Sequence, residues 1–449
     1  MANRVGASRE LGLWSATALV VGHTIGVGIF LTPAELIGAV GSPGLTLGLW
    51  LACGGILLAG ALTFGELGSR YPQAGGLYVY LREAWGRRIA FLYGWQSLLI
   101  MDPGVTAALA IGLAPYLVAV WPAAAGHERW VSLATVWALA LLNMSGLRLS
   151  SRTLNLLTAF KVLALLAVVA GAFTIGTGSW SHFSPWLTRR PGSPPLGQAL
   201  GLGLIGAFYS FGGFWEASRV AGEIREPRRT LPRALVTGVA AVTALYALTT
   251  LAFAYLVPPE HTVDARDFAR RVGQGLLGPA GPGVLAAVVV VSASASILAL
   301  LLMAPRLYVA MSRDGLFPAA LAALSPRTDS PARATALLAA LASLLVLTGS
   351  FSQVVALFMC TTLVFIGLAA AGLFVVRRRA AGITAFLAPG YPVTPAIFVL
   401  LVFVVIGLIA LARPIPALAG FVLMLIGVPV YAVLTRRARA GPVSLGGAR

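Results

Sequence analysis

The segment Val21-Gly-His-Thr-Ile-Gly-Val-Gly-Ile-Phe30 puts three glycines in the middle of an apolar stretch, Trp14–Pro33, that is long enough to cross a bilayer as a helix. Gly26 and Gly28 are two residues apart, so they cannot share one helix face as a small-xxx-small packing pair does. Close helix packing remains an alternative use of these glycines. Backbone groups freed at membrane depth need a cavity, an ion or a bound solute to satisfy them. The segment therefore predicts a membrane helix that is interrupted in mid-span.

A second stretch, Phe208-Tyr-Ser-Phe-Gly-Gly-Phe-Trp-Glu216, repeats this pattern five apolar spans later. Paired glycine breaks at corresponding places in two halves indicate a site near the bilayer midplane, between inverted repeats. The half-helix that starts near Gly26 would aim free N–H groups and a positive dipole end at an anion such as a carboxylate. The broken second stretch would offer carbonyl groups, which suit an ammonium group. Together the two breaks predict a pocket for a zwitterion.

The composition of the whole chain supports a membrane-embedded, all-helical fold. Of 449 residues, 58% are hydrophobic and 10% are charged, whereas roughly a quarter of the residues in a soluble domain are charged. Lipid offers no partner to an unpaired peptide group, so apolar stretches of this length cross it as helices. We expect twelve spans: Trp14–Pro33, Leu45–Glu66, Ile89–Leu113, Trp130–Leu147, Leu154–Thr177, Leu200–Ser218, Ala234–Val257, Val284–Ala310, Thr335–Gly349, Val354–Val376, Thr394–Leu411 and Pro416–Leu434.

The arginines that give the chain its net charge of +18 are distributed as the expected topology requires. If the N-terminus lies in the cytoplasm, most arginines fall in cytoplasmic segments, which is the positive-inside bias. We therefore expect a multi-pass protein of the cell (inner) membrane with both termini in the cytoplasm, and no nucleic-acid partner. The few arginines expected outside are Arg129, Arg189, Arg190, Arg266, Arg270, Arg271 and Arg413.

Two charged residues, Lys161 and Asp102, lie well inside expected spans and away from the span ends. Lys161, the only lysine of the chain, lies in the fifth span, and a charged amine at mid-bilayer costs on the order of 3 kcal/mol by insertion scales. A lysine can release its proton and an arginine cannot, so we expect a coupling or structural-cation role, with snorkelling to the interface as the alternative. Asp102 leaves three uses open, namely pairing with Lys161, staying protonated, or contacting a substrate amine. Glu66 and Glu216 are expected to be structural residues at helix ends.

Four ordered motifs resemble the amino acid–polyamine–organocation superfamily, particularly its L-type amino acid transporter branch and bacterial amino acid permeases. They are Gly22-His-Thr-Ile-Gly-Val-Gly-Ile-Phe30, Gly65-Glu-Leu-Gly-Ser-Arg-Tyr-Pro-Gln-Ala-Gly-Gly-Leu-Tyr-Val-Tyr80, Val220-Ala-Gly-Glu-Ile-Arg-Glu-Pro-Arg-Arg-Thr-Leu-Pro-Arg233 and Arg306-Leu-Tyr-Val-Ala-Met-Ser-Arg-Asp-Gly-Leu-Phe-Pro318. The resemblance implies a leucine-transporter-like fold that works by alternating access. A cytoplasmic segment (1–13) would precede inverted repeats at 14–177 and 178–376, with discontinuous first and sixth helices, and 377–449 would hold the last two helices and the cytoplasmic C-terminus.

The resemblance also implies roles for particular residues. Phe211 matches an aromatic lid over bound substrate, and Lys161 takes the position of a sodium ion in sodium-independent relatives, with Ser292 and Ser296 lining that place. The chain departs from the family pattern at Val27, where relatives carry a hydroxyl residue, and at His23, where they carry a small polar residue. His23 either senses pH or binds substrate, or packs as a neutral residue. The expected substrate-binding residues are His23, Ile25, Gly26, Val27, Gly28, Phe211, Gly212, Gly213 and Phe214.

The expected function is sodium-independent transport of amino acids, small neutral ones favoured, by exchange or proton-coupled symport. Transport of cationic amino acids, polyamines or other organic amines is the alternative within this class, and an amino-acid sensor without transport is the alternative of another class. No metal-binding spacing, Walker motif or convincing Ser-His-Asp set predicts an enzyme, a metal site or a cofactor. Cys53 and Cys360 both fall within spans, so no disulfide-linked accessory subunit is expected.

Overall fold

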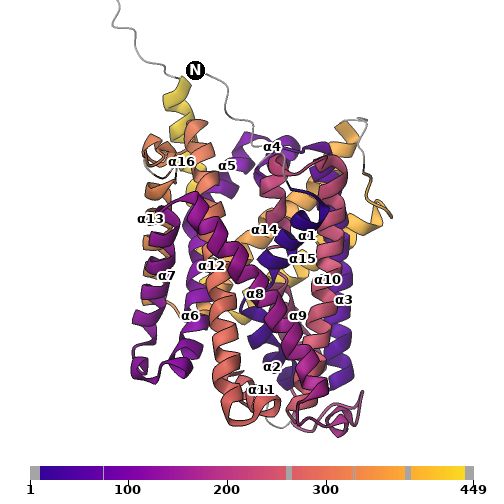
Figure 1. The fold of residues 1–449 in the computed structure, drawn as a ribbon. Coiled ribbons are helices and arrows are strands. Elements are labelled where there is room, and N and C mark those ends of the chain that lie inside the picture. Colours follow the sequence, from indigo (N-terminus) through magenta and orange to yellow (C-terminus); the bar gives the residue numbers. More distant parts are fainter. Residues whose placement is uncertain are drawn as a thin grey trace, which may run out of the picture.

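The computed structural model describes residues 11–73, 75–258, 265–326, 328, 330–379 and 386–439. These residues form a bundle of packed helices (Figure 1). Eight described helical segments are long and apolar enough to cross a membrane. They are α3 (Pro43–Arg70), the run of α5 (Arg87–Gln96) and α6 (Asp102–Val120), α8 (Leu147–Thr174), α10 (Pro227–Leu256), α12 (Gly281–Arg313), α14 (Phe351–Arg379), α15 (Val393–Ala412) and α16 (Pro414–Arg439).

The remaining expected spans coincide with shorter helices. The fourth and ninth correspond to α7 (Glu128–Met144) and α13 (Ala332–Thr348). The first and sixth are each divided, as α1 (Leu13–Thr24) with α2 (Gly28–Val40), and as α9 (Leu196–Ser210) with a 3₁₀ helix (Phe214–Glu223). Interruption of these two stretches was predicted from their glycines, and both interruptions are present. The count of twelve spans stays a prediction, because these segments are too short to qualify by length.

Two short helices mark opposite ends of the bundle. Figure 1 shows α4 (Leu77–Trp85) at one end, here called the α4 end, and α11 (Ala265–Leu277) at the other, the α11 end. The α11 helix lies in the expected polar loop Pro258–Pro282, whose residues 259–264 lie outside the described residues. The expected cytoplasmic segments include residues 1–10 and 440–449, which also lie outside them.

A change of helix type precedes Pro103 in the third expected span. Ser97–Met101 form a π-helical turn between α5 and α6. Proline has no N–H to donate to the preceding turn, and π-turns are commonly found at functional positions within helices. This turn brings Asp102 to the first position of α6, inside the bundle.

Candidate functional site

The first interruption lets two separate helices approach closely. The backbone leaves α1 at Ile25, which is extended (φ −73°, ψ 99°), and α2 begins at Gly28. A Cβ at Gly28 would lie 2.7 Å from the Ser210 hydroxyl at the end of α9. Glycine is therefore required here for contact between the two interrupted spans, and not only for flexibility.

The second interruption depends on a left-handed residue. Gly213 has φ +102°, a region that other residues rarely adopt. A Cβ at this position would also lie 3.2 Å from the carbonyl oxygen of His23. The turn at Gly213 thus redirects the chain from α9 into the 3₁₀ helix while it packs against the end of α1.

One tyrosine bridges the two interruptions. The Tyr246 hydroxyl, from α10, lies 2.9 Å from both the Thr24 carbonyl and the Ser210 carbonyl, which share its one donated proton. Carbonyls at helix C-termini lack intrahelical donors, so this hydroxyl satisfies a group at each break. The ring of Tyr246 packs against Phe211 and Trp50, with ring centroids 5.2 and 5.3 Å away.

Lys161 of α8 is 1% exposed, and its ammonium group lies at the first interruption. It donates to the carbonyls of Gly22 and Ile25, the latter at 2.7 Å, and to the Ser296 hydroxyl at 3.3 Å. All three acceptors are uncharged, and Lys161 forms no ion pair with any carboxylate in the described part of the chain. The snorkelling alternative is wrong, because the side chain points into the bundle. The possible pairing of Asp102 with Lys161 is not observed either.

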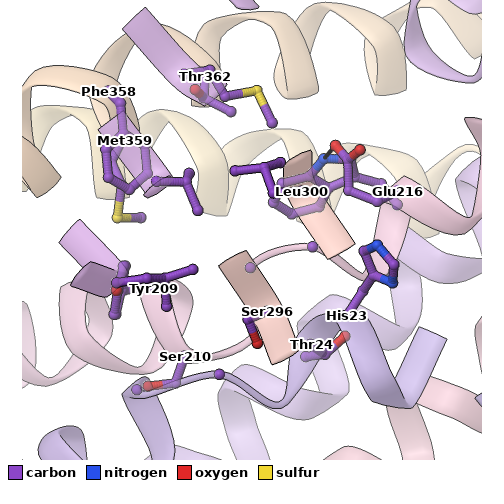
Figure 2. Close-up of a pocket in the computed structure, with 18 of the residues that line it drawn as sticks. His23, Thr24, Tyr209, Ser210, Glu216, Ser296, Leu300, Phe358, Met359 and Thr362 are labelled. Atoms are coloured by element: carbon purple, nitrogen blue, oxygen red, sulfur yellow. Dashed lines mark hydrogen bonds between the residues drawn. The ribbon is translucent and has the colours of Figure 1, made fainter. Parts of the chain in front are cut away.

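A cavity of about 120 Å³ lies beside the two interruptions (Figure 2). Its polar wall comes from the end of α1, the start of α2, the end of α9 and the start of the 3₁₀ helix. His23 of α1 and Glu216 of the 3₁₀ helix lie on the same side of the cavity. The other walls are mostly apolar and come from the π-helical turn, α6, α12 and α14. They include Met101, Val105, Leu109, Ala299, Leu300, Phe358, Met359, Leu363 and Ile366.

Two further cavities lie above and below this central one. A cavity of about 530 Å³ towards the α11 end is lined by α2, α9 and the start of α14, and Tyr209 lines both it and the central cavity. A cavity of about 360 Å³ towards the α4 end is lined by α4, α12 and the 3₁₀ helix. Arg219 lines this cavity and pairs with Glu216, which lines the central one. Tyr209 therefore lies where the central cavity adjoins the one towards the α11 end, and the Glu216–Arg219 pair lies where it adjoins the one towards the α4 end.

The Glu216–Arg219 pair belongs to a buried charged unit that also includes Asp102. Arg219 Nε lies 2.6 Å from Glu216 Oε2, and Arg219 Nη2 lies 3.9 Å from Asp102 Oδ1. The other Asp102 oxygen, Oδ2, accepts from the Tyr308 hydroxyl at 2.6 Å and from the Ser97 hydroxyl at 3.2 Å. Buried charges are costly without partners, and here two carboxylates share one guanidinium.

The structure places the expected site residues in two groups. Seven of them line the central cavity: His23, Gly26, Val27, Gly28, Gly212, Gly213 and Ser296. The others do not. Ile25 presents its carbonyl to Lys161, and the Ser292 hydroxyl makes no hydrogen bond to a described residue. The side chains of Phe211 and Phe214 are buried away from the cavity, the former against Trp50 and Tyr246 and the latter against Phe64 and Trp215.

Sequence reasoning missed several residues that line the cavity. Tyr209, two positions before Phe211, faces the central cavity (Figure 2). Glu216, expected to be structural, faces it as well, next to Trp215. A carboxylate so close to a mid-span glycine pair was the signal that could have identified Glu216.

The sequence profile of the amino acid permease family matches residues 11–435. The chain is 28% identical over 376 residues to the b(0,+)-type amino acid transporter 1 of Oryctolagus cuniculus, covering 82% of this chain and 76% of that protein. It is 28% identical over 446 residues to the Asc-type amino acid transporter 1 of Mus musculus, covering 95% of this chain and 81% of that protein. It is 26% identical over 436 residues to the serine/threonine exchanger SteT of Bacillus subtilis (strain 168), covering 96% of this chain and 98% of that protein.

Proposed function

The chain belongs to the amino acid permease family, and from this premise we propose that it is a sodium-independent secondary transporter of amino acids, small neutral ones favoured. It would work by exchange or by proton-coupled symport, with alternating access. Relatives named as transporters or exchangers of amino acids support transport rather than an enzymatic reaction.

The single observation that carries this proposal is the position of the Lys161 ammonium against the first interruption. A cation fixed on the Gly22 and Ile25 carbonyls supplies the positive charge that a bound metal ion would supply there. Next to it, α2 begins at Gly28, and the first N–H groups of a helix lack intrahelical acceptors. These groups suit a substrate carboxylate, and the terminal carbonyls of α9 suit its ammonium group. The central cavity, about 120 Å³, fits a small solute.

The cavities support a direction for the transport cycle. We assign the α4 end to the cytoplasm, in line with the arginine distribution, so that the α11 end faces outside. In this arrangement Tyr209 is the outer lid, a role that the sequence pattern had suggested for Phe211. The Glu216–Arg219 pair, with the Arg306–Glu223 pair (3.5 Å) nearer the α4 end, forms the inner barrier. The repeats at 14–177 and 178–376 are part of the same proposal.

The test is counterflow in proteoliposomes that contain the purified protein. Vesicles loaded with unlabelled alanine or serine should accumulate the labelled amino acid equally well in sodium and in choline medium. Counterflow without any effect of a pH gradient indicates exchange, and uptake driven by an inward proton gradient into empty vesicles indicates symport. Binding without uptake would instead support the sensor alternative, and sodium-dependent uptake would contradict the assignment of Lys161.

A second substrate class is favoured by one observation. Glu216 lines the central cavity, and Asp102 lies behind it on the same guanidinium. Their negative charge suits cationic amino acids or other organic amines. Labelled lysine and a labelled polyamine should be tested as substrates in the same counterflow experiment.

A further inference from the structure

The inference concerns the buried unit of Glu216, Arg219 and Asp102. Glu216 is 5% exposed and Asp102 is fully buried. Arg219 is the one described cation that pairs with either carboxylate, at 2.6 Å from Glu216 and 3.9 Å from Asp102. In their ordinary charge states these three side chains carry one negative charge in excess. Uncharged donors solvate the carboxylates, namely Trp215 Nε1 on Glu216 and the Tyr308 and Ser97 hydroxyls on Asp102.

The hydrogen bonding of this unit is incomplete. Asp102 Oδ1 accepts no hydrogen bond from a described residue, and Arg219 Nη1 donates none to one. Buried polar groups in proteins are nearly always paired. Both Glu216 oxygens have a donor, Arg219 Nε and Trp215 Nε1, whereas Asp102 Oδ1 has none. The two carboxylates share one guanidinium, and it is their excess negative charge that favours another positive group.

The excess charge faces the substrate space and not the lipid. Of the two carboxylates, Glu216 lines the central cavity, on the same side as His23 (Figure 2). Two titratable groups of other helices line the cavity, His23 of α1 and Tyr209 of α9, and two more hydrogen-bond to the charged unit, Tyr93 of α5 and Tyr308 of α12. None of these four carries a positive charge in its neutral form. Lys161 lies behind the first interruption on uncharged acceptors and does not line the cavity.

The cavity is consequently polarised. Its positive end is the start of α2, with the Lys161 ammonium behind it, and its negative end is Glu216. An amino acid whose carboxylate lies at the positive end would direct its side chain along the cavity. A side chain that ends in a cation would meet Glu216, whereas one that ends in a carboxylate would be repelled.

We propose that Glu216 is a specificity-determining residue whose carboxylate accepts the terminal ammonium of short cationic amino acids, so that these bind more tightly than neutral amino acids of the same shape. This inference rests on the proposed function in amino acid transport. It narrows the second substrate class to short cationic amino acids and assigns the residue that recognises them.

The experiment measures competition against labelled alanine counterflow by matched pairs of amino acids. 2,4-Diaminobutyrate and norvaline differ by an ammonium in place of a methyl group, as do ornithine and norleucine. The ratio of inhibition constants within a pair isolates the charge from the length of the side chain. In the wild-type protein the cationic member of at least one pair should inhibit more strongly. Glu216→Gln should shift that ratio towards the neutral member by about tenfold or more, the value of one hydrogen bond to a charged group.

Glu216→Gln is expected to fold, because Arg219 then pairs with Asp102 alone and no excess charge remains. Asp102→Asn is the second variant. In this variant Arg219 pairs with Glu216 only, and the excess negative charge is lost. The ratio of inhibition constants should therefore shift in the same direction, by a smaller factor. Glu83→Gln is the matched control, since Glu83 pairs with Arg82 at 3.0 Å on the exposed face of α4 and lines none of the three cavities.

The results separate this inference from the proposed function. If the wild-type protein exchanges neutral amino acids but neither diamino acid competes, the inference is wrong and the transport function stands. An unchanged ratio in both Glu216→Gln and Asp102→Asn would also overturn it. If no amino acid is exchanged by the wild-type protein, the proposed function itself fails.

Discussion

Replacement of Lys161 by methionine tests the central assignment, because methionine keeps an unbranched chain and removes the ammonium. Three contacts are lost, to the Gly22 carbonyl, the Ile25 carbonyl and the Ser296 hydroxyl. The Ile25 carbonyl keeps a donor, since the Ser296 hydroxyl lies 3.2 Å from it. The Gly22 carbonyl loses the donor that Lys161 supplies.

The magnitudes of these effects decide what the variant should show. A buried carbonyl without a donor costs about 1–3 kcal/mol. In the other direction, removal of a charged amine from the bilayer interior recovers on the order of 3 kcal/mol. The two terms nearly cancel, so the free energy of unfolding should change by no more than about 2 kcal/mol. The affinity for substrate should change more, because the cation behind the carboxylate-binding end of the cavity is gone. Loss of one interaction with a charged group corresponds to about a tenfold to hundredfold weaker apparent affinity.

The assay combines thermal unfolding of the purified variant with counterflow at several external pH values. Phe160→Met is the matched control, because the neighbouring Phe160 is 47% exposed on the outer face of α8. Lys161→Arg separates two roles, since arginine keeps the positive charge and does not release a proton. If Lys161 only supplies charge, the arginine variant should retain exchange; if it carries a proton, exchange should lose its pH dependence. Lys161→Met with wild-type affinity at every pH would refute the reasoning.

Three further predictions concern the interruptions. Tyr246→Phe removes the hydroxyl that donates to the Thr24 and Ser210 carbonyls, and should lower the free energy of unfolding by about 2 kcal/mol; thermal unfolding in detergent checks this, and an unchanged midpoint would contradict the bridge. Gly213→Ala forces a side chain into a φ of +102°, at a cost of about 1–2 kcal/mol, and should slow counterflow, whereas Gly55→Ala in α3, where a Cβ meets nothing within 4 Å, should leave the rate unchanged. Val27→Ser supplies the hydroxyl that the family pattern has at this position of the cavity wall, and should lower the apparent KM for a neutral amino acid about threefold to tenfold, by one hydrogen bond; a raised KM would show that no substrate carboxylate lies there.

The interruptions and the Lys161 site could be predicted because glycine and a lone buried charge act locally. Glycine pairs such as Gly26–Gly28 and Gly212–Gly213 weaken a helix whatever its neighbours are, and α1 and α9 end two residues before these pairs, at Thr24 and Ser210. Lys161 and Ser296 could be placed together through the resemblance, and the structure brings them within 3.3 Å. Contacts that join one interruption to the other, such as those of Tyr246, depend on the packing of distant helices and have no local sequence signal.

The directions of Phe211 and Glu216 were not predictable, for a reason that lies in the helix geometry. A continuous sixth helix over Leu200–Ser218 would have put Glu216 near its end, where a carboxylate is usually structural. The helix instead stops at Ser210, and the left-handed Gly213 sets a new direction before the 3₁₀ helix begins. The direction in which each later side chain points therefore depends on the turn at Gly213 and cannot be extrapolated from α9. In a 3₁₀ helix, residues three apart are eclipsed, which places Arg219 directly under Glu216 and makes the pair a barrier between two cavities. The same change of direction leaves Phe211 packed against Trp50 and leaves Tyr209, still within α9, facing the central cavity.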